Sequence, residues 1–441
     1  MGKVNQVARQ LSQKIQSRTA KVAVIGLGYV GLPLAVEFAR SGFPVLGIDK
    51  DKAKAVRIKR GILDTRDVNA NNLKALMKGK KLWVTTNVTR LGQCDCIIIC
   101  VPTPLNKVKE PDISFVLDAA RAVRNGLRKG QLVILESTVY PGTTEEIVLS
   151  EIARDGFEVG RDFFLCFSPE RIDPGNREYP LSRIPKVVGG ITESCTRLAV
   201  ALYRHVVDEV VPVSSPRVAE LSKLLENTFR VVNIGLMNEL VPVAHRLNVN
   251  IWEAIEAART KPFGYMPFYP GPGIGGHCIG IDPLYLSWKA KLVGSELRFI
   301  ELASRINASM PGYAVRRAID TLNAQGKTIK GARNLILGVS YKRDVGDIRE
   351  SPALEIIQEL LKRGARVQYH DPFVKILELE SAVLRSRPLT AKLLRNQDLI
   401  ILITDHTCVN YGLVAKKARL ILDTRNALSS FKKYSSKIVL L

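Results

Sequence analysis

The sequence predicts an α/β protein in which two Rossmann-like, doubly wound domains are joined by a helical central domain. Strand-sized apolar runs alternate with amphipathic segments in residues 21–213, long helical patterns replace them in residues 214–325, and the alternation returns in residues 326–441. Such alternation is typical of parallel sheets covered by helices. The 441 residues also call for more than one core, because single cores rarely grow beyond roughly 300 residues.

The first domain is preceded by residues 1–20, which mix Lys, Arg, Gln and Ser with spaced Val, Leu and Ile. This segment lacks the apolar stretch of a secretory signal, so we expect a short amphipathic lead-in helix. The domain itself begins at Lys21. Its strand-like runs are residues 22–25, 45–48, 97–101 and 133–135.

The central domain has helical periodicity in residues 218–247 and again in residues 283–323. A Gly/Pro-rich loop is predicted between them, over residues 263–280. Strand-like runs return in the C-terminal domain at residues 335–339, 367–369, 399–403 and 420–423. Because both terminal domains alternate strands with helices, we expect the two to be structurally alike.

Composition limits the classes of partner. The apolar runs are far shorter than the roughly 20 residues that span a bilayer, so we expect no membrane segment. Cys94, Cys96 and Cys100 lie in or beside a strand-like run and not at zinc-ligand spacing, which predicts buried thiols in a reducing cytoplasm and no metal site. The net charge of +23 favours anionic ligands. No long Lys/Arg run is interleaved with aromatic residues, so we do not expect nucleic acid.

A glycine-rich turn follows the first predicted strand. Residues 21–39 have the order strand, GxGxxG turn and helix, which is the order that a dinucleotide site requires. Gly26 allows the tight turn, Gly28 allows close approach of the pyrophosphate, and Gly31 allows close helix packing. The helix N-terminus then faces the negative charge of the ligand.

Asp49 ends the second strand-like run, eighteen residues after Gly31. A carboxylate there accepts hydrogen bonds from ribose hydroxyls and repels a 2′-phosphate, which favours NAD over NADP. The nearby Lys50, Lys52 and Lys54 could compensate for that repulsion.

The predicted Gly/Pro loop carries one thiol, Cys278, followed four residues later by Asp282. Such a loop brings backbone close to a ligand, and the thiol is a candidate nucleophile. The alternative interpretation is a linker with an incidental buried cysteine. His277 suggests a Cys-His dyad, but adjacent residues rarely point at one another, so we interpret His277 as structural.

Lys223 and Asn227 lie four residues apart and therefore on one face of the predicted helix. The apolar residues around them suggest that much of this helix is buried. A surface Lys/Asn pair is the ordinary explanation of this spacing.

With these motifs in hand, the chain resembles the UDP-glucose/GDP-mannose dehydrogenase family. The motifs occur in family order between about residues 20 and 430: Gly26-x-Gly28-Tyr-Val-Gly31-Leu-Pro, Val101-Pro-Thr103-Pro, Ser137-Thr138-Val-Tyr-Pro-Gly-Thr, Ser168-Pro-Glu170-Arg171, Lys223 with Asn227, Gly275-Gly276-His277-Cys278, and Tyr341-Lys342 with Arg349-Glu-Ser-Pro. Within the family, residues 260–278 are most similar to the branch that oxidises UDP-N-acetylglucosamine for surface-polysaccharide precursors. Gly280 departs from the proline expected in that branch, and Ile281 departs from the lysine usual in enzymes for UDP-glucose.

The resemblance implies NAD as cofactor, a UDP-sugar as substrate, and a homodimer or higher homo-oligomer paired through the central domain. Implied catalytic residues are Cys278 as nucleophile, Lys223 and Asn227 as donors to oxyanions, and Asp282, Glu170 and Thr138 for the proton and the hydrolytic water. Implied cofactor contacts are Gly26, Gly28, Val30, Gly31, Asp49, Lys54, Thr103, Thr138 and Arg349. Implied substrate contacts are Glu170, Arg171, Lys223, Asn227, Tyr269, Gly275, Lys342 and Arg259, the last toward a neighbouring subunit's substrate.

The chemistry implied by the family accounts for these residue types. Hydride transfer from C6 gives an aldehyde, the Cys278 thiolate captures it as a thiohemiacetal, a second hydride transfer gives a thioester, and water releases the acid. Three alternatives stay open: UDP-N-acetylmannosamine or UDP-glucose as the sugar, a two-electron dehydrogenase of the hydroxyacid type, and an NAD-sensing or polyanion-binding protein. A UDP-sugar dehydrogenase and a two-electron dehydrogenase of the hydroxyacid type differ in the number of NADH molecules formed per substrate molecule.

Overall fold

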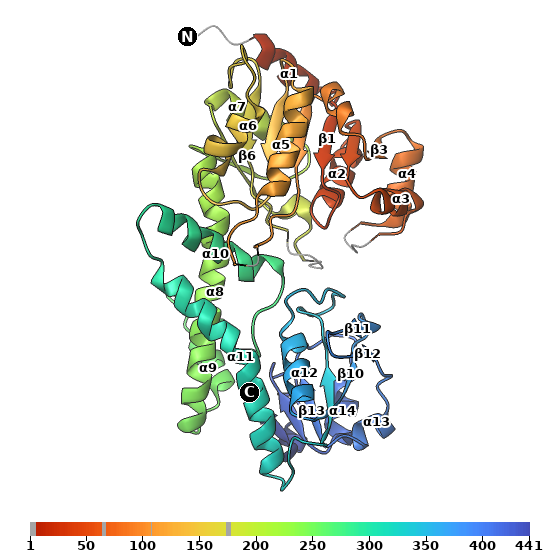
Figure 1. Ribbon diagram of the computed structural model, residues 1–441, viewed down its shortest axis with the longest axis vertical. Helices are drawn as coiled ribbons and strands as arrows, with labels where there is room; N and C mark the ends of the chain where they lie inside the picture. Colours follow the sequence, from red (N-terminus) through yellow and green to blue (C-terminus); the bar gives the residue numbers. More distant parts are fainter. Residues whose placement is uncertain (1–5, 64–67, 107, 173–177) are drawn as a thin grey trace. The chain divides into compact units, whose positions relative to one another are not determined.

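The computed structural model describes residues 6–63, 68–106, 108–172 and 178–441, apart from the side chains of His277 and Cys278. Residues 1–5 of the predicted lead-in segment therefore lie outside the described residues. The chain divides into two compact units, residues 1–226 with 288–294, and residues 227–287 with 295–441. Each unit has its own sheet, mainly parallel in the first unit and parallel in the second, and the chain is a mixed α/β protein (Figure 1).

The first unit is built on an eight-stranded sheet with the order β3-β2-β1-β4-β5-β6-β7-β8. Neighbouring strands are parallel except for β6 and β7, which are antiparallel. The strands are β1 (Val22–Ile25), β2 (Val45–Ile48), β3 (Leu82–Thr85), β4 (Cys96–Ile99), β5 (Leu132–Leu135), β6 (Phe164–Phe167), β7 (Lys186–Gly190) and β8 (Val210–Val213).

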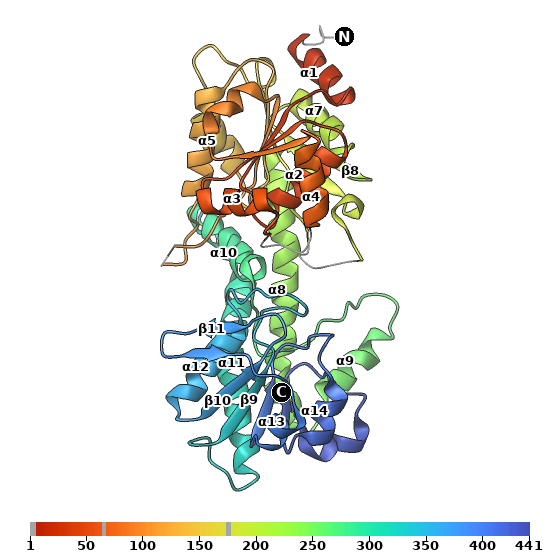
Figure 2. The same ribbon diagram turned by 90° about the vertical axis from the view of Figure 1, so that its right-hand side faces the viewer.

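Helices cover both faces of this sheet, which explains its near-continuous apolar strands. Side chains of α1, α2, α3, α4 and α7 pack on one face, and those of α5 and α6 pack on the other. Figure 2 shows α5 and α7 on opposite sides of the sheet. The helices are α1 (Gln6–Gln16), α2 (Gly31–Arg40), α3 (Lys52–Arg60), α4 (Ala70–Lys78), α5 (Ser114–Gly126), α6 (Leu149–Ile152) and α7 (Glu193–Tyr203).

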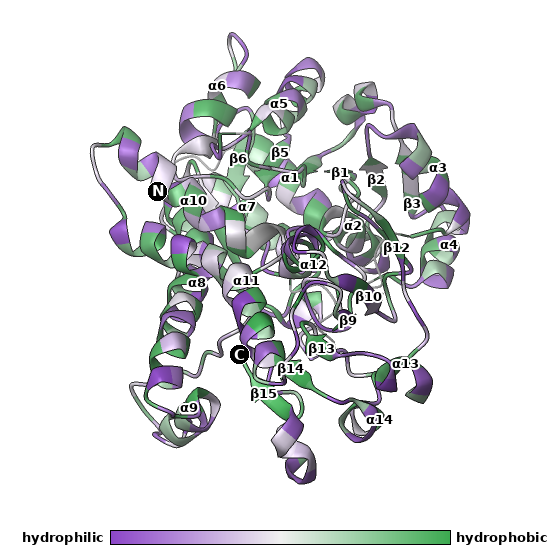
Figure 3. Cartoon of the chain, turned by 60° about the horizontal axis from the view of Figure 1, so that its bottom comes forward, coloured by the Kyte–Doolittle hydropathy of each residue, from purple (hydrophilic) through white to green (hydrophobic). Residues whose placement is uncertain are grey.

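The second unit contains the long helices of the centre of the chain and a five-stranded parallel sheet, β10-β9-β13-β14-β15. α11 and α12 pack on one face of the sheet, and α13 and α14 pack on the other. The strand β15 is hydrophobic along its length (Figure 3). The strands are β9 (Arg333–Leu337), β10 (Arg366–His370), β13 (Leu399–Leu402), β14 (Ile421–Asp423) and β15 (Ile438–Leu440), beside a hairpin of β11 (Ile376–Glu378) and β12 (Val383–Arg385).

Two helices contribute to both units, because the unit boundaries at 226/227 and 287/288 fall inside them. These are α8 (Pro216–Arg246) and α10 (His277–Leu292). The remaining helices of the second unit are α9 (Ile251–Arg259), α11 (Arg298–Asn323), α12 (Pro352–Lys362), α13 (Ala391–Arg395) and α14 (Tyr411–Lys417).

Two predicted element boundaries are wrong. The segment 283–323 is not one helix, because α10 ends at Leu292 and Gly294 then adopts the left-handed conformation (φ +74°) that stops a helix. The predicted loop 263–280 is also too long, since α10 begins at His277. The Cys278 backbone therefore belongs to the first turn of a helix and not to a loop.

Candidate active site

The turn after β1 has the close packing that its glycines predict. Gly26 has φ +92°, and a Cβ there would lie 2.4 Å from the Cys100 carbonyl oxygen. A Cβ at Gly31 would lie 1.9 Å from the Gly26 carbonyl oxygen. By contrast, a Cβ at Gly28 would have no atom within 4 Å, so this position faces open space. Val30 precedes α2 without a side-chain cap. The Leu32 N–H bonds the Gly28 carbonyl oxygen (3.2 Å) and Pro33 has no N–H, so it is the partial positive charge of the helix N-terminus that favours an anion here.

Asp49 lies at the end of β2 and bonds the same turn. Its Oδ2 accepts a hydrogen bond from the Leu27 N–H (2.9 Å) and pairs with Lys54 Nζ (2.8 Å), and its Oδ1 accepts from the Asp51 N–H (3.1 Å). Burial alone would raise the pKa of Asp49, but the bonds from Lys54 and these N–H groups lower it. Lys50 lies over the Phe115 ring, so of the nearby lysines Lys54 is the one paired with the carboxylate.

Three further predicted residues follow neighbouring strands at one edge of the sheet. Thr103 follows β4, Thr138 follows β5, and Glu170 follows β6. These three strands are parallel and adjacent, so their carboxyl ends meet at the same edge. Ligands of open α/β sheets bind at that edge.

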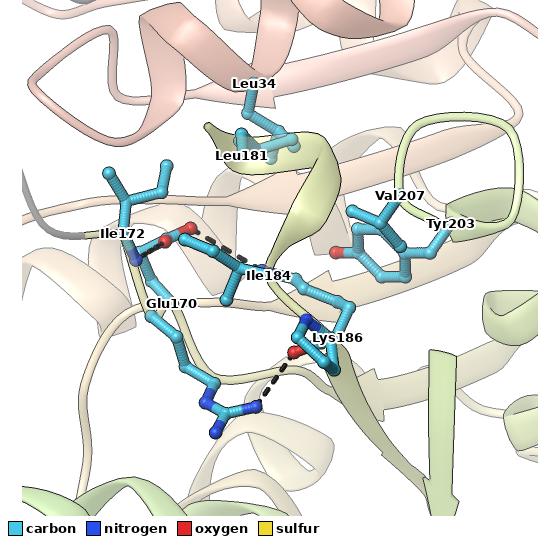
Figure 4. Close-up of a pocket in the computed structure, with 10 residues that line it drawn as sticks. Leu34, Glu170, Ile172, Leu181, Ile184, Lys186, Tyr203 and Val207 are labelled. Carbon is cyan, nitrogen blue, oxygen red and sulfur yellow. Dashed lines mark hydrogen bonds and ion pairs between the residues drawn. The ribbon is translucent and has the colours of Figure 1, made fainter. Parts of the chain in front are cut away.

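Glu170 lies within a buried group of charges beside a small cavity (Figure 4). Its Oε1 accepts a hydrogen bond from the Ile172 N–H, and its Oε2 lies 3.5 Å from Lys186 Nζ. Lys186 Nζ also pairs with Glu136 Oε2 at 2.8 Å. The Tyr203 hydroxyl donates a hydrogen bond to the other oxygen of Glu136.

These contacts shift the pKa values in different directions. Burial raises the pKa of Glu136 to about 7, although Lys186 opposes the shift. Burial also acts to raise the pKa of Glu170, but Lys186 and the Ile172 N–H outweigh it and lower that pKa. The pKa of Lys186 is raised, because the two carboxylates outweigh its burial. The ammonium is therefore held in its charged form.

One face of α8 is polar and buried, so Lys223 and Asn227 are not the surface pair that their spacing would ordinarily suggest. They are 8% and 7% exposed. Lys223 Nζ donates a hydrogen bond to the Glu170 carbonyl oxygen at 2.5 Å. Arg171, next to Glu170, pairs with Glu226 of the same helix (2.8 Å) and donates to the Pro185 carbonyl oxygen.

Asn227 bonds α8 to α10. Its Nδ2 donates a hydrogen bond to Oδ2 of Asp282, which is 3% exposed. Position 282 is one helical turn after position 278 in α10. The bond from Asn227 therefore holds the first turn of α10, which carries Cys278, close to α8. The side chain of Cys278 itself lies outside the described residues.

The glycines before α10 pack tightly on the C-terminal sheet domain. Cβ atoms at Gly275 and Gly276 would each lie 2.7 Å from the Tyr341 side chain, and Gly276 has φ +88°. At Gly271 a Cβ would lie 2.5 Å from an Arg425 nitrogen. Gly275, predicted as a substrate contact, is thus also required for packing.

The other predicted substrate and cofactor residues lie in the second unit. Arg259 pairs with Glu256 at 3.3 Å, and the Tyr269 hydroxyl donates to the same carboxylate at 2.5 Å while its ring stacks on Trp252. Arg349 pairs with Asp347 at 2.6 Å. Lys342 follows Tyr341, whose ring fills the space at Gly276.

Sequence reasoning missed Glu136, Lys186 and Glu220. Glu220 accepts hydrogen bonds from the N–H groups of Gly142 and Thr144, which tie the Thr138 segment to α8. Its spacing of three and seven residues from Lys223 and Asn227 was a usable signal, since these positions share one helix face. Glu136 directly precedes the Ser137-Thr138 motif, but no local pattern indicates its pairing with Lys186.

Within the described residues, no group of three or more His, Cys, Asp or Glu side chains is arranged to hold a metal ion. None of the helices that the structure describes is long and apolar enough to cross a membrane.

Comparison with known proteins matches three family models along the chain. They describe the NAD binding domain (residues 20–207), the central domain (217–309) and the UDP binding domain (335–430) of the UDP-glucose/GDP-mannose dehydrogenase family. The UDP-N-acetyl-D-glucosamine 6-dehydrogenase of Pseudomonas aeruginosa is 39% identical over 80% of this chain and 83% of its own length. The UDP-N-acetyl-D-mannosamine dehydrogenase of Pyrococcus horikoshii is 36% identical over 92% of this chain and 96% of its own length.

Solved structures agree with the sequence matches. A structure titled as the UDP-D-ManNAc dehydrogenase of Pyrococcus horikoshii aligns with a TM-score of 0.83 at 35% identity, covering 92% of this chain and 96% of that chain. A UDP-glucose dehydrogenase from Pyrobaculum islandicum aligns with the same TM-score at 27% identity, covering 96% of each chain.

Proposed function

Because the chain belongs to the UDP-glucose/GDP-mannose dehydrogenase family, we propose that it oxidises the C6 alcohol of a UDP-sugar to a carboxylate in two steps at Cys278. It is an NAD-dependent oxidoreductase of the UDP-sugar dehydrogenase class. The proposal adds the four-electron course, the nucleophile and the sugar. The observation that carries it is the buried polar face of α8, where Lys223 bonds Glu170 and Asn227 bonds Asp282.

The residues of the first sheet fit NAD. Gly28 faces open space, the first turn of α2 has no side-chain cap, and Asp49 presents a carboxylate at the end of β2. Asp49 Oδ1 accepts from the Asp51 N–H and has a second acceptor direction, so it can bind a ribose hydroxyl while keeping its present partner. Bound NAD would take up the hydride removed from C6 in each step. Val30, Lys54, Thr103, Thr138 and Arg349 are the further contacts that we propose.

Cys278 has the backbone setting of an activated thiol. It lies in the first turn of α10, where the partial positive charge of the helix N-terminus favours a thiolate. Other cysteines differ, since burial raises the pKa of Cys96 and of Cys166 far above the ordinary value. In the proposed course the Cys278 thiolate attacks the C6 aldehyde and carries the thioester after the second oxidation.

The remaining residues have roles that follow from their charge. Lys223 and Asn227 are buried donors that can stabilise oxygen anions formed at C6. Glu170, held as a carboxylate beside Lys186, or Asp282 takes the proton of the water that releases the acid. Thr138 assists with this water, and Arg171, Arg259, Tyr269, Gly275 and Lys342 form the proposed UDP-sugar contacts.

UDP-N-acetylglucosamine is the proposed sugar, and its product would be a surface-polysaccharide precursor. Residues 260–278 and Ile281 support this sugar over UDP-glucose. Two relatives named UDP-N-acetyl-D-glucosamine 6-dehydrogenase are 39% and 37% identical to this chain. UDP-N-acetylmannosamine is the second candidate, because a relative named for it aligns over 92% of the chain at 36% identity.

The test is a panel of UDP-N-acetylglucosamine, UDP-N-acetylmannosamine and UDP-glucose, with NADH counted per sugar and the acid identified by mass spectrometry. We expect two NADH per sugar and the highest kcat/KM for UDP-N-acetylglucosamine. One NADH per sugar would indicate a two-electron dehydrogenase instead. A higher kcat/KM for either other sugar would overturn the choice of substrate.

A homodimer or higher homo-oligomer is supported by exposed apolar residues along α8 and directly after it. Leu236, Leu240 and Val243 of α8 and Leu247, the residue that follows the helix, recur every three or four residues and are between 37% and 68% exposed. A stripe with this spacing lies on one helix face and is typical of a helix that packs against another chain. Leu240→Glu should therefore lower the mass measured by light scattering, whereas an unchanged mass would argue against this interface.

A cytoplasmic location is proposed from the cysteines. Cys94, Cys96, Cys100, Cys166, Cys195 and Cys408 are all free thiols, which suits a reducing compartment. We also propose that the domain boundaries lie at residues 20/21, 213/214 and 325/326.

A further inference from the structure

A single ammonium serves two carboxylates in the interior of the first unit. Lys186 Nζ lies 2.8 Å from Glu136 Oε2 and 3.5 Å from Glu170 Oε2. It also donates a hydrogen bond to the Pro169 carbonyl oxygen at 3.3 Å, directly before Glu170. The side chains of Glu136, Lys186 and Glu170 are all buried. One positive charge therefore sets the balance between two negative groups, because water does not screen them.

Glu170 has an oxygen left over for chemistry. Its Oε1 is bonded by the Ile172 N–H, but no hydrogen-bond donor among the described residues reaches its buried Oε2. Beside it lies a cavity of about 10 Å³, lined in part by Glu170, Lys186 and Tyr203 (Figure 4). A buried oxygen without a partner is costly unless a nearby charge stabilises it, and Lys186 is that charge.

The other groups around Lys186 and its two carboxylates, Glu136 and Glu170, lie on separate helices and strands. Tyr203 of α7 donates to Glu136, Cys100 lies at the end of β4, and Lys223 of α8 bonds the Glu170 backbone. Burial raises the pKa values of Tyr203 and Cys100 well above their ordinary range, so both are neutral near pH 7. The charges that act on Glu170 are thus those of Lys186, Glu136 and Lys223.

We propose that Lys186 and Glu136 are positioning residues for the reaction: Lys186 holds Glu170 as an oriented carboxylate, and Glu136 holds Lys186 in place. This inference rests on the proposed function, in which Glu170 handles the proton of the hydrolytic water. Glu136, which follows β5, accepts hydrogen bonds from Lys186 and from Tyr203 of α7 with different oxygens. Its position between them holds the Lys186 ammonium in place. Because burial raises the pKa of Glu136 to about 7, this carboxyl can become uncharged near neutral pH. The Lys186 ammonium then acts on the Glu170 carboxylate alone.

The test is the pH profile of kcat for acid formation in single variants. Lys186→Met should move the acidic limb upward by about one pH unit, because Glu170 loses the cation that favours its charged form. Lys186→Arg should restore the wild-type limb, since it keeps the charge. Glu136→Gln should leave the limb unchanged or move it to lower pH, because the ammonium then serves Glu170 alone.

Lys186→Met leaves Glu136 without its cation and could unfold the protein, so the double variant Glu136→Gln/Lys186→Met is the second arm. It removes both charges and should still show the upward shift. Lys14→Met is the matched control, because it breaks a lysine pair of 2.9 Å with Asp95 before β4 and should leave the profile unchanged. Thermal unfolding of every variant checks the fold.

An unshifted limb in folded Lys186→Met or in the double variant would overturn the inference, as would an upward shift in Glu136→Gln. Failure of the proposed function looks different. In that case the wild-type protein itself makes no uronic acid from any UDP-sugar in the panel.

Discussion

The turn after the first strand is built in the same way in the N-terminal and the C-terminal sheets. Gly26 follows β1 with φ +92°, and Gly338 follows β9 with φ +79°. A Cβ on Gly26 would lie 2.4 Å from the Cys100 carbonyl oxygen, and one on Gly338 would lie 2.3 Å from that of Thr404. In both sheets the glycine N–H donates a hydrogen bond to the last residue of the next strand, at 2.8 and 2.9 Å.

The aspartate after that next strand also has the same bond in both sheets. Asp49 accepts from the Leu27 N–H at 2.9 Å, and Asp371 accepts from the Val339 N–H at 2.7 Å. The difference is the second partner. Asp49 pairs with Lys54, whereas Asp371 is fully enclosed and bonds the buried His406 at 3.0 Å.

The helix after the turn differs as well. α2 begins at Gly31, directly after the turn, while α12 begins at Pro352, beyond a long loop. The N-terminal sheet thus keeps a helix N-terminus beside a carboxylate that is 8% exposed, whereas in the C-terminal sheet the carboxylate is 1% exposed and the helix begins much later in the chain. The comparison teaches that a shared backbone turn becomes a dinucleotide site only when its carboxylate and helix stay accessible to the ligand.

The largest expected effect lies outside both turns, at Cys278. If the two sheet domains bind NAD and the UDP-sugar and the Cys278 thiol carries out the chemistry, Cys278→Ala should lower kcat for acid formation by about 10³-fold or more. Binding of NAD and the UDP-sugar should survive. Cys278→Ser could accumulate an ester that intact-protein mass spectrometry detects. Cys408→Ala, at an exposed cysteine, is the control. Near wild-type acid formation by Cys278→Ala would end the covalent proposal.

The next effect tests whether the two turns are equivalent. Gly26→Ala and Gly338→Ala should each lower the free energy of unfolding by about 3 kcal/mol, because both combine a left-handed φ with a backbone clash. Urea unfolding measures this. Gly28→Ala is the matched control: it has space for a Cβ and should weaken NAD binding with little loss of stability. A mild effect at only one of the two turns would break the equivalence.

The paired aspartates separate binding from stability. Asp49→Ala should weaken NAD binding by about tenfold and narrow the preference over NADP, because a ribose acceptor is lost. Asp371→Ala should leave NAD affinity unchanged but lower stability by about 3 kcal/mol, since it removes the carboxylate that bonds the His406 ring and accepts from four backbone N–H groups. Calorimetry with NAD and NADP and urea unfolding give the two readouts. The comparison would be wrong if Asp371→Ala lost NAD or Asp49→Ala kept its preference.

The smallest effect is on acid stability. Burial would raise the pKa of Asp371, but the bonds from His406 and the Val339 N–H lower it below the ordinary 3.8. A carboxylate whose pKa is lower in the folded state than in the unfolded state stabilises the fold at pH values above its unfolded-state pKa. This contribution is therefore lost as the pH falls below about 3.8. We expect the free energy of unfolding to fall over this range. Asp371→Asn should flatten this part of the stability curve, and an equally steep acid loss in that variant would argue against the assignment.

Much of the candidate site was visible as local pattern. The Gly26 turn and Asp49 follow strand periodicity, and Lys223 and Asn227 share a helix face by their spacing. The start of α10 was not visible, because glycines and prolines up to Gly280 suggest a loop and the helix continues through Pro283. The structure shows that packing against Tyr341 requires some of these glycines.

The sequence by itself determined the α/β fold class, the order of the three family regions and the NAD turn, because these depend on short-range periodicity and on glycine chemistry. Only the tertiary structure decided which charges meet. Glu136 and Lys186 are 50 residues apart, and Asp371 and His406 are 35 apart. Their pairing follows from strand order and from the need to satisfy buried charges, and neither leaves a periodic trace in the sequence.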